Sequence, residues 1–138
     1  MPKTILVGVD GSESSRRAAE VAAALAASTG ATLHVMMAAD DKARSAEGEY
    51  LGDVRLQSDA EATATEIAQS LTGISPNVHS TLAHGKPAEA LVTVATDIGA
   101  DLIVVGNRRV QGIGRILGSV ATDVAHRAPC DVYIVKTV

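Results

Sequence analysis

The sequence has almost no aromatic side chains: of its 138 residues none is Phe or Trp, and only two are Tyr. Proteins that bind single-stranded RNA or DNA usually stack the bases on aromatic rings. The net charge of −4 also has the wrong sign for a surface that neutralises the phosphates of a nucleic acid. We therefore expect no nucleic-acid partner, and a core built from Val, Ile, Leu, Ala and a few Met.

Cysteine is equally scarce, because Cys130 is the only one in the sequence. An internal disulfide and a cysteine metal site are therefore excluded. No apolar run is long enough to span a bilayer, and the first residues lead into a strand without the pattern of a signal peptide. We expect a cytoplasmic protein without a membrane partner, and the length predicts a single domain over residues 1–138.

Apolar runs typical of buried strands alternate with amphipathic segments typical of helices. The strands are expected at 4–9, 31–37, 77–83, 101–105 and 132–135, and the helices at 13–29, 53–72, 87–98 and 119–127. Residues 40–52 show no periodicity and predict a surface loop. This alternation predicts an α/β fold, with an open five-stranded parallel sheet and helices on both faces.

In such sheets, ligands bind beyond the carboxyl ends of the strands, where the strand order reverses. If the first strand is central and the fourth lies beside it, the turn at Asp10-Gly11-Ser12 meets Gly106-Asn107. The stretch from Gly106 to Ser119 also carries Arg108, Arg109, Arg115, Gly112 and Gly114. A basic, glycine-rich loop before a helix N-terminus favours an anion, so we expect a phosphate-bearing ligand here.

Two common nucleotide motifs are missing from these positions. The turn after the first strand, residues 10–15, does not contain the G-x-G-x-x-G of dinucleotide-binding enzymes. A P-loop requires a lysine between the glycine and the serine or threonine, and Gly118-Ser119 has none. Both of these enzyme classes are excluded.

Several of these residues also admit a purely structural interpretation. Gly106, Gly112, Gly114 and Gly118 can supply positive φ angles in turns, and Ser119 can cap the last helix or bind a phosphate oxygen. Asp10 can cap the first helix or stabilise the turn at Gly11, or it can hold ribose hydroxyls or a Mg²⁺ ion. The four histidines are scattered and form no ligand or catalytic set.

Five segments together resemble the universal stress protein family: VGVDGS at 7–12, GKPA at 85–88, GADLIVVG at 99–106, LGSV at 117–120 and APCDV at 128–132. The resemblance covers essentially the whole chain. It implies a Rossmann-like fold, similar to the adenine nucleotide alpha-hydrolases, and a homodimer paired through the last strand, Val132–Thr137. Many members bind ATP, some bind cyclic AMP, and others bind no nucleotide.

The resemblance also implies a set of binding residues. Gly8, Val9 and Asp10 would flank the adenosine, Val35 would line the base pocket, and Asp10 would help to hold a Mg²⁺ ion that accompanies ATP. The phosphates would meet Gly106, Asn107, Arg108, Arg109, Gly112, Gly118, Ser119 and Val120.

The ATP-binding members carry Gly-x₂-Gly-x₉-Gly-Ser/Thr after the fourth strand. Gly106 matches the first glycine and Gly118-Ser119 the final pair, but Arg109 stands at the second glycine and the segment to Gly118 is one residue shorter. The side chain of Arg109 either obstructs the approach of the phosphates or replaces the lost amide contacts with a charged hydrogen bond.

The function that we expect is a stress-response module that binds ATP and signals by its bound state. A cyclic AMP-binding member and a dimeric interaction protein without a nucleotide are the alternatives. A weak ATPase that phosphorylates itself at Ser119 is a further possibility, and the lack of a convincing general base counts against it.

Overall fold

The computed structural model describes the backbone of residues 2–39, 50–107 and 118–137, and the side chains of these residues apart from 50–58. Five strands alternate with four helices in this part of the chain. The elements are β1 (Thr4–Val9), α1 (Glu13–Thr29), β2 (Thr32–Ala39), α2 (Tyr50–Leu71), β3 (Val78–His84), α3 (Pro87–Ile98), β4 (Leu102–Gly106), α4 (Ser119–Arg127) and β5 (Asp131–Val135).

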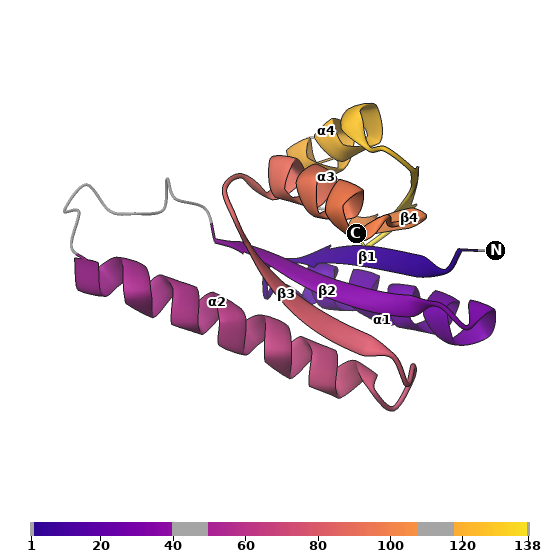
Figure 1. Ribbon diagram of the computed structural model, residues 1–138, viewed down its shortest axis with the longest axis horizontal. Coiled ribbons are helices and arrows are strands. Elements are labelled where there is room, and N and C mark those ends of the chain that lie inside the picture. The colour runs from indigo at the N-terminus through magenta and orange to yellow at the C-terminus, as the bar shows by residue number, and fades with distance from the viewer. Residues whose placement is uncertain (1, 40–49, 108–117, 138) are drawn as a thin grey trace.

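The strands form one parallel sheet in the order β3-β2-β1-β4-β5. Helices α1 and α2 cover one face of this sheet, and α3 and α4 cover the other (Figure 1). The predicted α/β fold is confirmed. The central position of β1, with β4 at its side, is confirmed as well, so the strand order reverses between these two strands.

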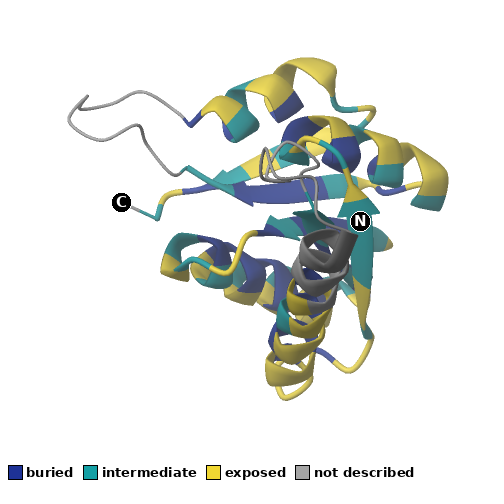
Figure 2. Cartoon of the chain, turned by 90° about the vertical axis from the view of Figure 1, so that its left-hand side faces the viewer, coloured by how far each residue is buried: buried dark blue, intermediate teal, exposed yellow. Residues whose placement is uncertain are grey.

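The core lies on both faces of the sheet, because successive side chains of a strand point to opposite sides. In β1, Ile5 and Val7 pack with α1 and α2, whereas Leu6 packs with α3 and α4. The buried residues in Figure 2 follow the strands and the sheet-facing side of each helix. Small side chains, such as Ala18 and Ala22 of α1, are completely buried and allow the helices to lie close to the sheet.

The helix ends follow local sequence signals. The Ser12 hydroxyl accepts a hydrogen bond from the backbone N–H of Ser15 and caps α1. Gly30 and Gly99 adopt left-handed φ angles directly after α1 and α3. Serine before a helix and glycine after it are the residue types that favour these positions. At α4, Gly118 occupies the capping position and Ser119 is the first helical residue, so the interpretation of Ser119 as the helix cap does not hold.

Helix α2 begins at Tyr50, so the end of the predicted loop at 50–52 is helical. The rest of that loop, residues 40–49, lies outside the described residues. Figure 1 shows the first turns of α2 extending beyond the sheet. Gly52 and the polar residues around it give this stretch a weak helical signal in the sequence.

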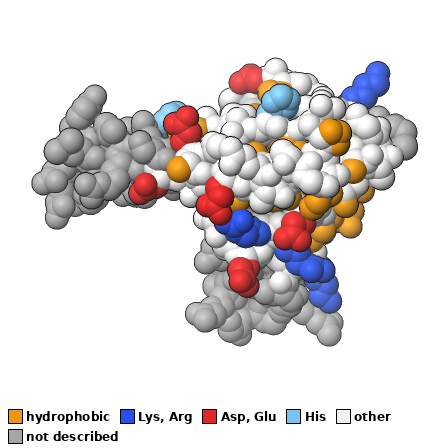
Figure 3. All heavy atoms as spheres, turned by 90° about the horizontal axis from the view of Figure 1, so that it is seen from below, with side chains coloured by type: hydrophobic (Ala, Val, Ile, Leu, Met, Phe, Trp, Pro, Cys, Tyr) orange, Lys and Arg blue, Asp and Glu red, His pale blue; other side chains and the backbone are white. Residues whose placement is uncertain are grey.

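Charged side chains of both signs are interspersed on the face where α1 and α2 lie, as Figure 3 shows for the coloured residues. One opposite pair, Arg16 of α1 and Glu66 of α2, is joined at 3.0 Å. The coloured residues of this face form no continuous basic patch of the kind that binds a nucleic acid. Among the described helices, none has the length and apolar character needed to cross a bilayer.

Candidate ligand-binding site

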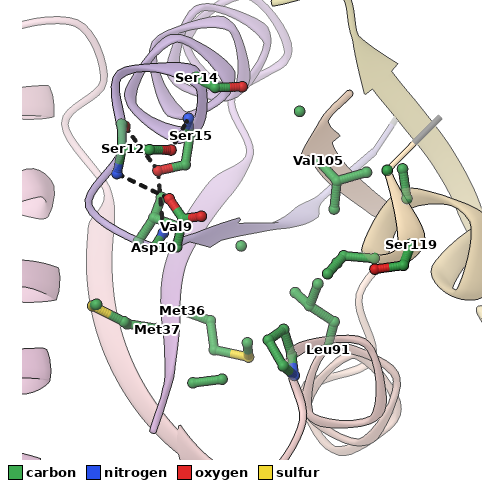
Figure 4. Close-up of a pocket in the computed structure, with 17 residues that line it drawn as sticks. Val9, Asp10, Ser12, Ser14, Ser15, Met36, Met37, Leu91, Val105 and Ser119 are labelled. Atoms are coloured by element: carbon green, nitrogen blue, oxygen red, sulfur yellow. Dashed lines mark hydrogen bonds between the residues drawn. The ribbon is translucent and has the colours of Figure 1, made fainter. Parts of the chain in front are cut away.

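A cavity of about 360 Å³ lies at the carboxyl ends of β1, β2 and β4, at the point where the strand order reverses. Its volume is within the usual range for small-molecule sites. Figure 4 shows side chains from both helix layers around this space. The lining residues are Gly8, Val9, Asp10, Ser12, Ser14, Ser15, Met36, Met37, Ala38, Pro87, Leu91, Val105, Gly106, Gly118, Ser119, Val120 and Ala121.

One part of the lining is apolar. Met36 from β2, Leu91 from α3 and Val105 from β4 are almost completely buried and contribute to the same packed cluster. Gly8 allows this packing, because a Cβ at that position would lie 3.0 Å from Cδ1 of Leu91. This part of the cavity suits a flat, largely apolar group such as a heterocyclic base.

The polar wall at the start of α1 is fixed by four hydrogen bonds within one turn. The Asp10 carboxylate accepts from the Ser12 N–H at 2.9 Å, and the Ser12 hydroxyl accepts from the Ser15 N–H at 3.2 Å. The Ser15 hydroxyl accepts from the Asp10 N–H at 3.1 Å and donates to the Ser12 carbonyl at 3.0 Å. The turn is therefore preorganised, and the Asp10 carboxylate is held at the rim of the cavity.

The opposite wall is the N-terminus of α4. Gly118, Ser119, Val120 and Ala121 line the cavity there, and no side chain caps the helix at Gly118. The N–H groups in the first turn of a helix have no acceptor within the helix, and the helix dipole places partial positive charge at this end. This wall is suited to bind an anion.

The structure brings most of the predicted site residues together. Those that line the cavity are Gly8, Val9, Asp10, Gly106, Gly118, Ser119 and Val120. Arg108, Arg109 and Gly112, with Gly114 and Arg115, lie outside the described residues. Asn107 is not a lining residue, since its side-chain oxygen accepts hydrogen bonds from Thr137 instead.

Val35 does not lie at the predicted place. It is completely buried in the cluster formed with α1 and α2, on the face of the sheet away from the cavity. Because side chains alternate along a strand, its neighbour Met36 points to the cavity face instead. Val35 is therefore not a cavity residue as predicted, and the residues of β2 that line the cavity are Met36, Met37 and Ala38.

The sequence analysis missed the contributions of α3 and of the first turn of α1. Pro87, Leu91, Ser14 and Ser15 all line the cavity. A signal for α3 was present in the GKPA segment at 85–88, which belongs to the family resemblance. No local pattern marked Leu91, because it reads as an ordinary core position of an amphipathic helix.

Gly106 and Gly118, which line the cavity, do not supply the positive φ angles that glycines often provide in turns. Positive φ angles occur at Gly11, Gly30, Gly85 and Gly99 among the described residues, whereas Gly118 has a φ of −60°. At Gly106 the requirement is a close approach. A Cβ at that position would lie 3.1 Å from the Ser14 hydroxyl oxygen, so this glycine allows β4 and α1 to meet.

The sequence profile of the Universal stress protein family matches residues 1–136. The chain belongs to the universal stress protein family. This universal stress protein is 39% identical to one from Thermus aquaticus, an alignment that covers 99% of this chain and 100% of the relative. It is 38% identical to one from Mycobacterium tuberculosis strain H37Rv, over 98% of this chain and 97% of the relative.

A solved structure of a universal stress protein in complex with cAMP has the same fold. It superposes with a TM-score of 0.79 at 34% sequence identity, and the alignment covers 99% of both chains. A second solved structure, of a universal stress protein from Archaeoglobus fulgidus, superposes with a TM-score of 0.79 at 24% identity. The predicted Rossmann-like fold is therefore confirmed.

Proposed function

We propose that this universal stress protein binds an adenine nucleotide, ATP in the first instance, in the cavity between α1, α3 and α4. One observation carries the proposal: the N-terminus of α4, at which none of the described side chains forms a cap, and an apolar surface line the same cavity. A nucleotide needs both, since its base is largely apolar and its phosphates are anionic. The relative solved with cAMP, at 34% identity, supports the same ligand class.

The geometry suggests how the nucleotide lies. The base packs on the apolar side, against Met36 and Leu91. The ribose lies near Asp10, whose carboxylate is held at the rim by the Ser12 N–H. The phosphates lie at the start of α4, where backbone N–H groups and the helix dipole stabilise negative charge.

A magnesium ion fits this site only as a companion of the phosphates. Asp10 is the only carboxylate among the lining residues described, and the described residues contain no cluster of three or more His, Cys, Asp or Glu that could hold a metal ion. Mg²⁺ often takes one protein carboxylate and completes its shell with phosphate oxygens and water. Asp10 would supply that single protein ligand.

We infer a role as a stress-response binding module that signals by its bound state. Asp10 is also the only titratable side chain among the described residues of the lining. Hydrolysis or transfer to Ser119 would therefore have to use it as the general base, although its carboxylate already accepts a hydrogen bond from the backbone of Ser12. Phosphate release in the presence of ATP and Mg²⁺ tests this: we expect binding without turnover.

Calorimetric titration with ATP, cAMP and adenosine tests the binding proposal. Ser119→Glu places a negative charge on the exposed first residue of α4, where the helix dipole tolerates it but a phosphate does not. We expect this variant to lose at least tenfold in ATP affinity and to bind adenosine as the wild type does. Gln69→Glu, at an exposed position of α2, changes the charge equally and serves as the matched control.

The nucleotides distinguish the alternatives. Binding of cAMP without binding of ATP would identify a cyclic-nucleotide member of the family. If the folded protein binds none of the three ligands, the proposal is wrong and the function lies at a protein surface. Equal loss of ATP affinity in the Ser119 and Gln69 variants would show that the α4 N-terminus is not the phosphate site.

We further propose that two copies pair through the last strand, as the family resemblance implies. β5 lies at the edge of the sheet, and Tyr133 on this strand is 45% exposed. An apolar edge strand readily pairs with another strand. Analytical ultracentrifugation tests this: we expect a dimer for the wild type and a larger monomer fraction for Tyr133→Glu, whereas a monomeric wild type would contradict it.

A further inference from the structure

A chain of hydrogen bonds joins the segment after β5 to two other parts of the molecule. The side-chain oxygen of Asn107 accepts from the backbone N–H of Thr137 at 2.8 Å and from the Thr137 hydroxyl at 3.0 Å. The Thr137 hydroxyl is also bonded to the Ser14 hydroxyl of α1. These three residues, which we call the Asn107–Thr137–Ser14 network, are partly buried.

The two hydrogen bonds from Thr137 to Asn107 fix the direction of the bond between Thr137 and Ser14. Because the Thr137 hydroxyl donates its only proton to Asn107, the bond to Ser14 must run the other way, and the Ser14 hydroxyl donates. The backbone of Asn107 is tied down as well, since its N–H donates to the Val135 carbonyl at 3.1 Å. Only one assignment of donors and acceptors satisfies all three hydrogen bonds of the network.

The network lies directly behind the cavity wall. Ser14 and Gly106 both line the cavity, and Gly106 precedes Asn107 in the chain. A Cβ on Gly106 would lie 3.1 Å from the Ser14 hydroxyl and 3.6 Å from Cγ2 of Thr137. The end of β4 is thus held against α1 by contacts and hydrogen bonds at the edge of the cavity.

We propose that Asn107 and Thr137 are positioning residues for the ligand site, and that they couple β5 to ligand affinity. This inference rests on the proposed function of the cavity. The network sets the separation between Gly106 and Ser14, and the ligand binds best at one value of that separation. By linkage, a ligand that favours this arrangement also strengthens the attachment of Thr137.

The test compares nucleotide affinity among variants of nearly equal shape. Thr137→Val keeps the branched side chain next to Gly106 but removes the hydroxyl. We expect it to bind the nucleotide about threefold to tenfold more weakly, the loss that corresponds to one or two hydrogen bonds. Thr137→Ser keeps the hydroxyl, so we expect it to bind the nucleotide within about twofold of the wild type. This result is required if the role of Thr137 depends on its hydroxyl.

A matched control separates positioning from general stability. The Thr96 hydroxyl donates to the Val92 carbonyl within α3 at an exposed position, so Thr96→Val also removes one hydroxyl, with a single hydrogen bond where Thr137→Val removes two. We expect both valine variants to be fully folded at the temperature of the titration, with weaker binding only in Thr137→Val. Equal affinities for the wild type and Thr137→Val would overturn the proposal.

Hydrogen exchange keeps the inference testable apart from the ligand. In the free protein we expect Thr137→Val to speed exchange at the hydrogen-bonded amides of Ser15 and Asn107, and Thr96→Val to leave both rates unchanged. If the wild type binds no adenine nucleotide, the proposed function fails, and the network is judged on these rates alone. Unchanged exchange in Thr137→Val would overturn it.

Discussion

Cδ1 of Leu91 lies 3.0 Å from the point that a β-carbon on residue 8 would occupy, and Cδ2 lies at 3.1 Å. Gly8 is in the central strand, and Leu91 is the buried residue through which α3 packs on that strand. The missing side chain allows α3 to approach the sheet. This contact sets the apolar wall of the cavity next to the point where the strand order reverses.

We predict that Gly8→Ala destabilises the protein by about 1–3 kcal/mol, because the added methyl group overpacks a filled core. In a Leu91→Ala background the same change should cost much less, since the truncated side chain leaves room for it. Urea denaturation of the two single variants and the double variant measures this. Equal costs of Gly8→Ala in both backgrounds would show that Leu91 is not the cause.

Ser12 has two separable roles, one in the helix and one at the cavity. Ser12→Ala should lose about 1 kcal/mol of stability with the cap of α1, whereas Ser12→Asp, which also caps, should stay near the wild type. The new charge of Ser12→Asp should nevertheless weaken ATP binding, because Ser12 lines the cavity. Chemical denaturation and calorimetry measure the two effects. A stable Ser12→Asp that binds ATP normally would show that the nucleotide does not come near this wall of the cavity.

The imidazole rings of His34 and His79 lie side by side on β2 and β3, with their centres 5.4 Å apart. The pKa of His34 is lowered from 6.5, first by burial and then by the charge of His79. The folded protein therefore binds fewer protons at this position than the unfolded chain. The neutral form of His34 therefore contributes to the free energy of unfolding. This contribution is fully present above about pH 6.5 and is lost as the pH falls through the lower pKa of the folded state.

We therefore predict that His34→Gln reduces the loss of stability between about pH 7.5 and about pH 5. His79→Gln should reduce that loss less, because it removes only the charge and leaves the burial. Denaturation midpoints across this pH range measure both variants. The same pH dependence in the wild type and His34→Gln would show that another group is responsible.

Cys130 should react slowly with alkylating reagents in the folded protein. Its thiol pKa is raised from 9.0 by burial and by the negative charges of Asp131 and Asp101, and the thiolate is the reactive form. Iodoacetamide at about pH 8 should therefore modify the folded protein more slowly than the urea-unfolded chain. Asp131→Asn should speed the reaction of the folded protein. Equal rates for the folded and unfolded chains would contradict the raised pKa.

Local patterns in the sequence were sufficient for the order of the elements, the ends of α1 and α3 and the position of the crevice. Apolar periodicity depends on whether each segment has one buried face or two, and that information is local. The cap at Ser12 and the left-handed glycine at Gly30 likewise depend on a few neighbouring residues. The alternation of strands and helices predicts parallel connections, but the central place of the first strand beside the fourth was a condition, which the observed strand order meets.

The identity of the cavity residues depended on packing between distant segments. Alternation along β2 places Val35 and Met36 on opposite faces, but only the position of α3 over Gly8 decides which face holds the cavity. The hydrogen bond between Ser14 and Thr137 joins residues 123 positions apart, and no local pattern predicts it. The sequence by itself determined the strands, the helices and the edge of the sheet where a ligand can bind. Only the tertiary structure decided which side chains meet there, because those contacts depend on the distance at which each helix packs against the sheet.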